Sequence, residues 1–177
     1  IDVKEYVDFH GKNVTVQEGI WLKEGAIARD GSNYKKILFY DGTLNGNIKA
    51  DEIRISNYMY VNSGTHTLQG RVTGSNPDKW YSKWFVLQVY SGANLVIDGN
   101  VVGTDNLSSS STISNNGVIT VTGSISGAIE QLSGSGIYNV GGDVSKYSVS
   151  GTPTFVFCGN GLQNVSLTEI PKCEILN

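Results

Sequence analysis

The sequence is poor in charge, and this scarcity excludes two classes of partner. Only 16% of the 177 residues are charged, and 13 basic residues stand against 16 acidic ones, for a net charge of −3. A chain with this balance has no basic footprint for nucleic acid or for anionic lipid. No stretch approaches the roughly 20 apolar residues that a membrane-spanning helix needs. The sequence therefore predicts neither a nucleic-acid partner nor a membrane span.

Histidine is equally scarce, which leaves little material for a metal centre or a catalytic triad. The two histidines, His10 and His66, are far apart in the sequence, and neither lies near a cysteine. No EF-hand calcium loop, phosphate-binding glycine loop or G-x-S-x-G nucleophile motif occurs. We therefore expect no metal and no cofactor.

There are only two cysteines, Cys158 and Cys173, and both lie near the C-terminus. A disulfide between them would close a loop of about 15 residues and stabilise the fold by roughly 3 kcal/mol in the chain-entropy model. Scarce cysteine and methionine beside abundant glycine, serine, threonine and asparagine is typical of a secreted protein. The sequence favours this disulfide and a secreted or cell-surface location. Two separate buried thiols in a cytosolic protein are the alternative.

What the sequence has in abundance is strand-forming segments separated by turns. Asp-Gly and Asn-Gly pairs punctuate them, as at Asp98-Gly99 and Asn116-Gly117. No segment extends into a persuasive amphipathic helix. The pattern predicts an all-β fold. The segments rich in valine, isoleucine and aromatic residues are 14–16, 36–40, 53–55, 84–90, 95–97, 118–121 and 154–157.

An internal repeat, apolar-x-Gly-x-[Ile/Val], favours one kind of all-β fold over the others. Its copies centre on Gly46, Gly70, Gly99, Gly123 and Gly142, so that successive glycines are 24, 29, 24 and 19 residues apart. A period near 20 to 25 residues fits one coil of a parallel β-solenoid, in which each coil contains two or three short strands. Glycine would permit the corner between two strands, while the flanking apolar residues would fill a narrow core.

Two segments, ILFYDGTLNGNIKADEIRI and ANLVIDGNVVGTDN, resemble coils of right-handed parallel β-helix proteins. Those proteins include pectate-lyase-like polysaccharide enzymes, phage tailspikes and bacterial surface adhesins. The opening IDVKEY resembles the first strand of many of them, although this sequence lacks the capping helix that usually follows. The resemblance implies a right-handed parallel β-helix of about seven short rungs.

We expect one domain over residues 1–177. Residues 1–24 would form an N-terminal cap, residues 25–162 the rungs, and residues 163–177 a C-terminal cap that contains the possible disulfide. A β-sandwich or jelly roll is the alternative fold, and it would make the repeat accidental. Parallel pairing of the strands would refute that alternative.

Polysaccharide cleavage is the enzymatic activity that the resemblance implies. It needs paired carboxylates, or a basic residue beside a charge-neutralising group. In KADEIRI, strand alternation places Glu52 and Arg54 on one side, with Lys49 nearby and Asp51 on the other side. The Gly-His-Gly and Asn-x-Asp motifs of polygalacturonase-like β-helices do not occur. A solvent-exposed ion pair is the plainer interpretation of these residues.

The longest interval between repeat glycines contains SNPDKWYSKW, residues 75–84. Extra residues in one coil must leave it as a loop, and such loops are where solenoids usually carry function. Aromatic faces here would stack on sugar rings, and polar side chains would bond to hydroxyls. In the alternative interpretation the tryptophans are buried. The candidate ligand-binding residues are Asp78, Lys79, Trp80, Tyr81 and Trp84, with Tyr58 and Tyr60 one coil earlier.

The sequence therefore favours a secreted or cell-surface domain that recognises a glycan or another cell-surface ligand without cleaving it, as a monomer or a homotrimer. The second hypothesis is a polysaccharide lyase or glycoside hydrolase, including a fragment of a phage tailspike depolymerase. The third is a structural adhesin stalk that binds no ligand.

Overall fold

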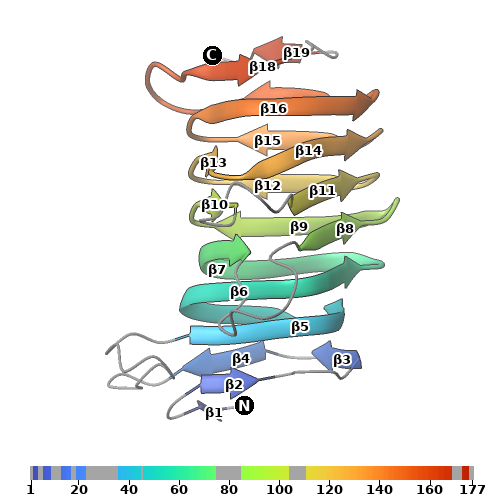
Figure 1. The fold of residues 1–177 in the computed structure, drawn as a ribbon, viewed down its shortest axis with the longest axis vertical. Coiled ribbons are helices and arrows are strands. Elements are labelled where there is room, and N and C mark those ends of the chain that lie inside the picture. The colour runs from blue at the N-terminus through green and yellow to red at the C-terminus, as the bar shows by residue number, and fades with distance from the viewer. Residues whose placement is uncertain are drawn as a thin grey trace.

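The protein is an all-β structure, as the sequence predicts. In Figure 1 the strands of this computed structural model lie one above another along the long axis, from β1 near the N-terminus to β19 near the C-terminus. The described part of the chain contains no helix, and so none that is long and apolar enough to cross a membrane. The described residues are 2–3, 6–8, 13–16, 19–22, 36–44, 46–74, 85–103, 111–168 and 173–175.

Most of the strands are short, and several of the longer ones bend from one side of the molecule to the next. Their bounds are Asp2–Val3 (β1), Tyr6–Asp8 (β2), Asn13–Val16 (β3), Gly19–Leu22 (β4), Lys36–Leu44 (β5), Asn47–Val61 (β6), Gly64–Gly74 (β7), Val86–Val89 (β8), Ala93–Asp98 (β9), Val101–Val102 (β10), Ser111–Asn115 (β11), Val118–Val121 (β12), Ile125–Ser126 (β13), Ile129–Gly134 (β14), Ile137–Val140 (β15), Val144–Gly151 (β16), Thr154–Phe157 (β17), Val165–Leu167 (β18) and Cys173–Ile175 (β19).

The strands form three parallel stacks, which we call the first, second and third faces. The first face contains β1, β4, the starts of β6 and β7, and then β9, β12, β15, β17 and β19. The second contains β2, the start of β5, the middle of β6, the end of β7, and then β10, β13, the start of β16 and β18. The third contains β3, the ends of β5 and β6, and then β8, β11, β14 and the end of β16.

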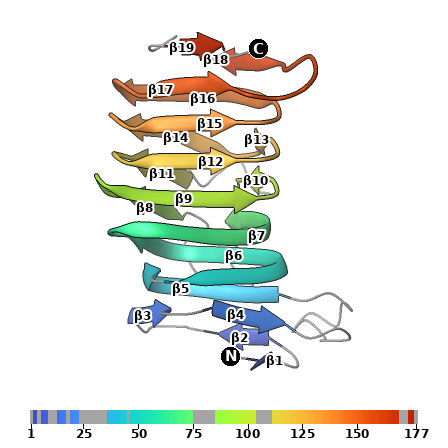
Figure 2. The same ribbon diagram turned by 180° about the vertical axis from the view of Figure 1, so that it is seen from behind.

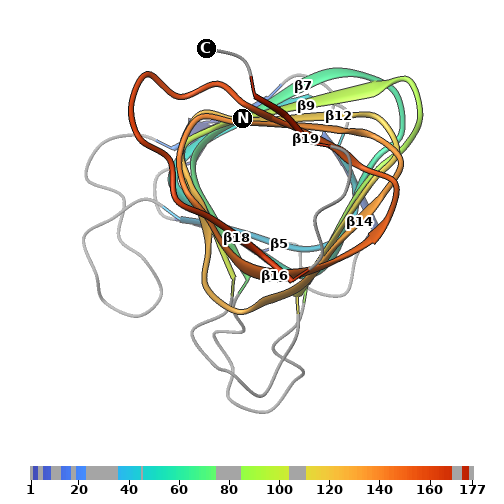
Figure 3. The ribbon, with the colours of Figure 1, turned by 90° about the horizontal axis from the view of Figure 1, so that it is seen from above.

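The chain visits these faces in turn, which gives the sheet a solenoid-like curl. Figure 3, viewed along the long axis, shows the coloured coils enclosing one interior, and Figure 2 shows the first face from behind. All pairings between the described strands are parallel. A jelly roll pairs its strands antiparallel. The β-sandwich or jelly-roll alternative is therefore excluded.

Four of the five repeat glycines occupy the same corner, where the first face turns into the second. The pairing of Leu68 with Ile97 places Gly70 directly beside Gly99 on the next coil. A Cβ atom on Gly123 would lie only 2.7 Å from the carbonyl oxygen of Gly99, so that backbone follows backbone too closely for a side chain. The repeat thus marks a real corner. Its members are Gly70, Gly99, Gly123 and Gly142.

The copy centred on Gly46 is out of this register, contrary to the sequence analysis. Ile48 pairs with Leu68, which makes the spacing 20 residues here. The residue beneath Gly70 is consequently Ala50, whose carbonyl oxygen a Gly70 side chain would strike. The pairing depends on which apolar residues enter the core. Gly46 fits the motif because Leu44 and Ile48 flank it at the required spacing, but Ile48, not Leu44, pairs with Leu68. The motif alone could not show this.

Beside this corner, side-chain oxygens accept hydrogen bonds from backbone N–H groups of the next coil. The amide oxygen of Asn100 accepts a hydrogen bond from the backbone N–H of Ser124 at 2.8 Å. The hydroxyl oxygen of Ser124 accepts from the backbone N–H of Asp143 at 2.9 Å. The carboxylate of Asp143 accepts from the backbone N–H of Asn164 at 2.8 Å. Backbone groups that leave the strand ladder at the corner are therefore satisfied by the preceding coil.

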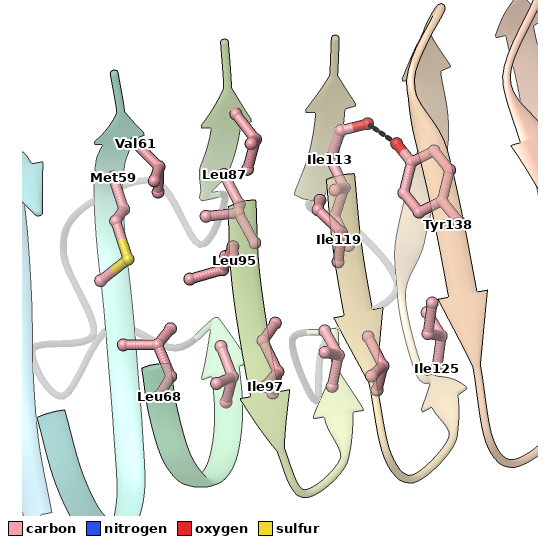
Figure 4. Close-up of a cluster of buried hydrophobic side chains, with 14 of the residues drawn as sticks. Met59, Val61, Leu68, Leu87, Leu95, Ile97, Ile113, Ile119, Ile125 and Tyr138 are labelled. Carbon is pink, nitrogen blue, oxygen red and sulfur yellow. Dashed lines mark hydrogen bonds between the residues drawn. The ribbon is translucent and has the colours of Figure 1, made fainter. Parts of the chain in front are cut away.

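Inward side chains form one continuous core along the axis, from Phe39 to Phe157. Figure 4 shows part of this core, including residues from Met59 to Tyr138. Strand β9 shows its origin, because Ala93, Leu95 and Ile97 are buried while the residues between them are partly exposed. Successive side chains of a strand point to opposite sides, so every second residue enters the interior. The alternating pattern in the sequence is thus the pattern of the core.

One tyrosine belongs to this core. Tyr138 is fully buried, and its hydroxyl lies 2.9 Å from the carbonyl oxygen of Ser133 and 3.1 Å from that of Ile113 (Figure 4). Burial raises the pKa of this phenol well above its ordinary value. Its ring stacks on Phe155 with 4.9 Å between ring centroids. The hydroxyl thus reaches backbone partners, so a polar group is buried without being orphaned.

The predicted disulfide is not formed, because Cys158 is an exposed free cysteine. On the first face Cys173 pairs with Phe155, three residues before Cys158. Three residues of extended strand span about 10 Å, whereas the Cα atoms of a disulfide are at most about 7 Å apart. The register of β17 and β19 therefore separates the two cysteines, although their spacing in the sequence suits a loop closure.

Candidate functional site

The predicted aromatic loop lies outside the described residues, and with it Asp78, Lys79, Trp80, Tyr81 and Trp84. The structure does describe the two points at which segment 75–84 attaches. Gly74 ends β7 on the second face, and the buried Phe85 precedes β8 on the third. The segment is therefore inserted at the corner between these faces.

A second insertion attaches at the same corner one coil later. Segment 104–110 joins Gly103, which follows β10, to Ser111 at the start of β11. Val102 of β10 pairs with Thr73 of β7, so the two insertions start from equivalent places on neighbouring coils. The sequence analysis assigned function to the first insertion only.

Tyr58 and Tyr60 lie on the third face, one coil before β8. Their rings are stacked, with 5.6 Å between centroids and 7° between planes. The residue between them, Met59, is fully buried in the core, so both tyrosines lie on the outward side of β6. Tyr58 pairs with Val86, two residues after segment 75–84 ends. The structure thus places this tyrosine pair beside the attachment of the predicted loop.

A third tyrosine, Tyr90, belongs to the same region and was missed by the sequence analysis. Its side chain is 39% exposed, at the end of β8. Leu87 and Val89 are buried, so Gln88 and Tyr90 share the outward side. Gln88 pairs with Tyr60, which puts Tyr90 diagonally beyond the tyrosine pair. The alternation of apolar and polar residues in VLQVY already indicated that Tyr90 points outward. The sequence did not show that β6, with Tyr58 and Tyr60, is the neighbouring strand.

The outward side chains of the third face form two columns from β6 to β16. Neighbouring residues in a column belong to paired strands about 4.8 Å apart. None of them is charged. One column contains Tyr58, Val86, Thr112, Gln131 and Ser148, and the other Tyr60, Gln88, Ser114, Ser133 and Ser150.

The two glutamines of these columns have side-chain amides that are available for hydrogen bonds to a ligand. The side-chain amides of Gln88 and Gln131 have no hydrogen-bond partner among the described residues. On the first face, by contrast, the amide of Asn139 donates to the Thr120 hydroxyl at 3.1 Å. The third face therefore combines aromatic rings with unused amides, which is the combination that suits a ligand bearing hydroxyl groups.

Two of the three candidate catalytic residues, Glu52 and Arg54, form an ion pair rather than an open site. Glu52 accepts a hydrogen bond from Arg54, and its other carboxylate oxygen lies 3.3 Å from a guanidinium nitrogen of Arg71. The Glu52 side chain is only 8% exposed. Strand alternation predicted that Asp51 would lie on the opposite side of the strand from Glu52. Asp51 is exposed instead, because the register between β6 and β7 shifts between Lys49 and Glu52. The predicted proximity of Glu52 and Arg54 is confirmed.

Because Glu52 is covered and bound by two arginines, we expect it to stabilise the fold. Glu52→Gln should lower the free energy of unfolding by about 1 to 2 kcal/mol, mainly through Arg54, since Arg71 is more exposed and better solvated. Chemical denaturation followed by circular dichroism measures this. The control Glu130→Gln, the same change at an exposed position on β14, should alter stability by less than about 0.5 kcal/mol. An unchanged stability in Glu52→Gln would contradict the structural role.

The described residues contain no group of three or more histidine, cysteine, aspartate or glutamate side chains that could hold a metal ion. His66 is nearly buried on β7, and its Nε2 lies 2.7 Å from the carbonyl oxygen of Ser63. This contact closes the turn between β6 and β7. His66 is thus part of the fold at that turn.

Comparisons of the chain with protein-family models, with curated proteins and with solved structures find no match. The function is therefore argued from the residues and contacts of the chain itself.

Proposed function

We propose that the chain is a right-handed parallel β-helix module, secreted or displayed at a cell surface, that binds a glycan on its third face. The parallel stacks and the solenoid-like curl support the β-helix. The stacked pair Tyr58–Tyr60 carries the assignment of the ligand, because it is an aromatic surface on an otherwise polar sheet. The apolar C–H faces of sugar rings pack on such surfaces, while amides and hydroxyls bond to the sugar hydroxyls.

Three further features support recognition at this place. Tyr90 adds an exposed ring on the next coil. Segment 75–84, which contains two tryptophans, is joined to β8 beside the tyrosine pair. The carboxylate of Glu52 is bound to Arg54 and covered, which favours a binding module over a lyase or hydrolase.

Binding of the labelled protein to a panel of bacterial, plant and animal polysaccharides tests this proposal. We expect retention on one glycan class, and a loss of about five-fold in affinity in Tyr60→Ala, because stacking on an aromatic ring contributes on the order of 1 kcal/mol. Trp80→Ala should weaken the same interaction. Thr154→Ala, on the partly exposed side of the first face, is the control and should bind normally.

Two outcomes would contradict the proposal. If no polysaccharide retains the protein, the structural hypothesis of an adhesin stalk takes its place. If the retained polysaccharide is shortened during incubation, the module is an enzyme.

Sedimentation of the same sample distinguishes a monomer from a homotrimer.

A further inference from the structure

The outward side chains in the two columns of the third face carry no charge. From β6 to β16 these side chains are tyrosine, glutamine, threonine, serine and one valine. The arginines Arg54 and Arg71 belong to the second face, and Glu52 is bound to both of them. Among the described residues, these two arginines thus lie off the third face and are already paired with a carboxylate.

The charges that border this face do not favour an anion either. Asp41 pairs with Tyr58 and stands one coil before the tyrosine pair. Glu130 and Lys146, one of each sign, precede the face on β14 and β16. Within the described part of the chain, the two columns thus contain no basic residue that could pair with an acidic ligand. Electrostatics therefore discriminates against an acidic ligand, whose charges would lose water without gaining a partner.

The available amides also indicate a direction. Gln88 follows Tyr60 by one coil and lies in its column, whereas Gln131 lies in the other column two coils further on. The path from the tyrosine pair through Gln88 to Gln131 crosses three steps between paired strands, or about 14 Å along the axis. A ligand lying along a single strand would reach Gln88 and Tyr90 but not Gln131.

We propose that the ligand is a neutral oligosaccharide that lies along the axis of the third face, stacked on Tyr58 and Tyr60 and hydrogen-bonded to Gln88 and Gln131. This inference rests on the proposed function. It adds the charge class of the glycan, its direction and two specificity-determining residues. Each glutamine amide both donates and accepts, so it pairs with a sugar hydroxyl in either sense.

Oligosaccharides of graded length test the direction. Calorimetry would compare di-, tetra- and hexasaccharides from neutral glucans, mannans and galactans. Gln88→Ala should weaken all lengths by about five-fold, the loss expected for one hydrogen bond. Gln131→Ala should weaken the hexasaccharide by a similar factor and leave the disaccharide unaffected, because only the longer ligand reaches β14. Asn139→Ala, an amide on the first face, is the matched control.

Oligogalacturonate and hyaluronan fragments test the charge class. We expect them to bind at least ten-fold more weakly than the neutral hexasaccharide, with little change between low and moderate salt. Equal or tighter binding of the acidic fragments would overturn the neutral assignment. Unchanged hexasaccharide binding in Gln131→Ala would overturn the axial direction while leaving glycan recognition intact. If no polysaccharide or fragment binds the native protein, the proposed function fails as a whole.

Discussion

Gly70→Ala should lower the free energy of unfolding by about 3 kcal/mol or more, or prevent folding. Gly70 has a φ of 131°, which side chains rarely adopt, and its Cβ atom would strike the carbonyl oxygen of Ala50 on the preceding coil. The position of a Cβ atom is fixed by the backbone and the carbonyl oxygen belongs to the backbone, so neither can rotate away, and strain at a special φ adds to the clash. Chemical denaturation followed by circular dichroism measures the change.

Gly161→Ala is the matched control for this substitution. A Cβ atom at Gly161 would have no atom within 4 Å, and its φ is not positive. We expect its stability to remain within about 0.5 kcal/mol of the native protein. Equal losses in Gly70→Ala and Gly161→Ala would show that the close stacking at the repeat corner is not what requires glycine.

Asn115→Ala should cost about 3 kcal/mol. Asn115 is fully buried, and its amide donates to the carbonyl oxygen of Ile137 at 2.8 Å while its side-chain oxygen accepts from the backbone N–H of Gly117 at 3.0 Å. Alanine would leave both backbone groups without these partners in a place that water reaches poorly. Thermal and chemical denaturation both report this loss.

Asn139→Ala provides the comparison for this prediction. Asn139 is partly exposed, and its amide donates to the hydroxyl of Thr120 on the outside of the first face. Water replaces that bond readily, so the loss should stay near 0.5 kcal/mol. If both asparagines proved equally important, burial would not be the cause of the Asn115 effect.

Much of the fold could be predicted because it depends on local periodicity. Alternation in segments such as 95–97 and 118–121 predicted strands with one buried side, and the structure buries Leu95, Ile97 and Val121. The glycine repeat predicted a corner that recurs on successive coils. It failed at Gly46, where the apolar residues that enter the core set a different register. A short motif reports a corner but not which residues pair across it.

The candidate site could be predicted only in part. Tyr58 and Tyr60 were selected for their neighbourhood in the sequence, and the structure stacks their rings on the third face. Tyr90 and the two glutamines were missed, because residues of different coils become neighbours only through pairing. Glu52 was correctly placed beside Arg54, but the role of Arg71, 19 residues later, required the register of β6 and β7.

The order of residues along the chain, read alone, determines that this protein is built from short strands with one apolar side, separated by glycine turns, since both properties arise within a few neighbouring residues. Pairing between coils decides the rest, and coils of unequal length make that pairing impossible to count from the sequence. It separates Cys158 from Cys173, buries Asn115 and gathers the tyrosines with unused amides on one face. These are consequences of register, which the whole core determines together.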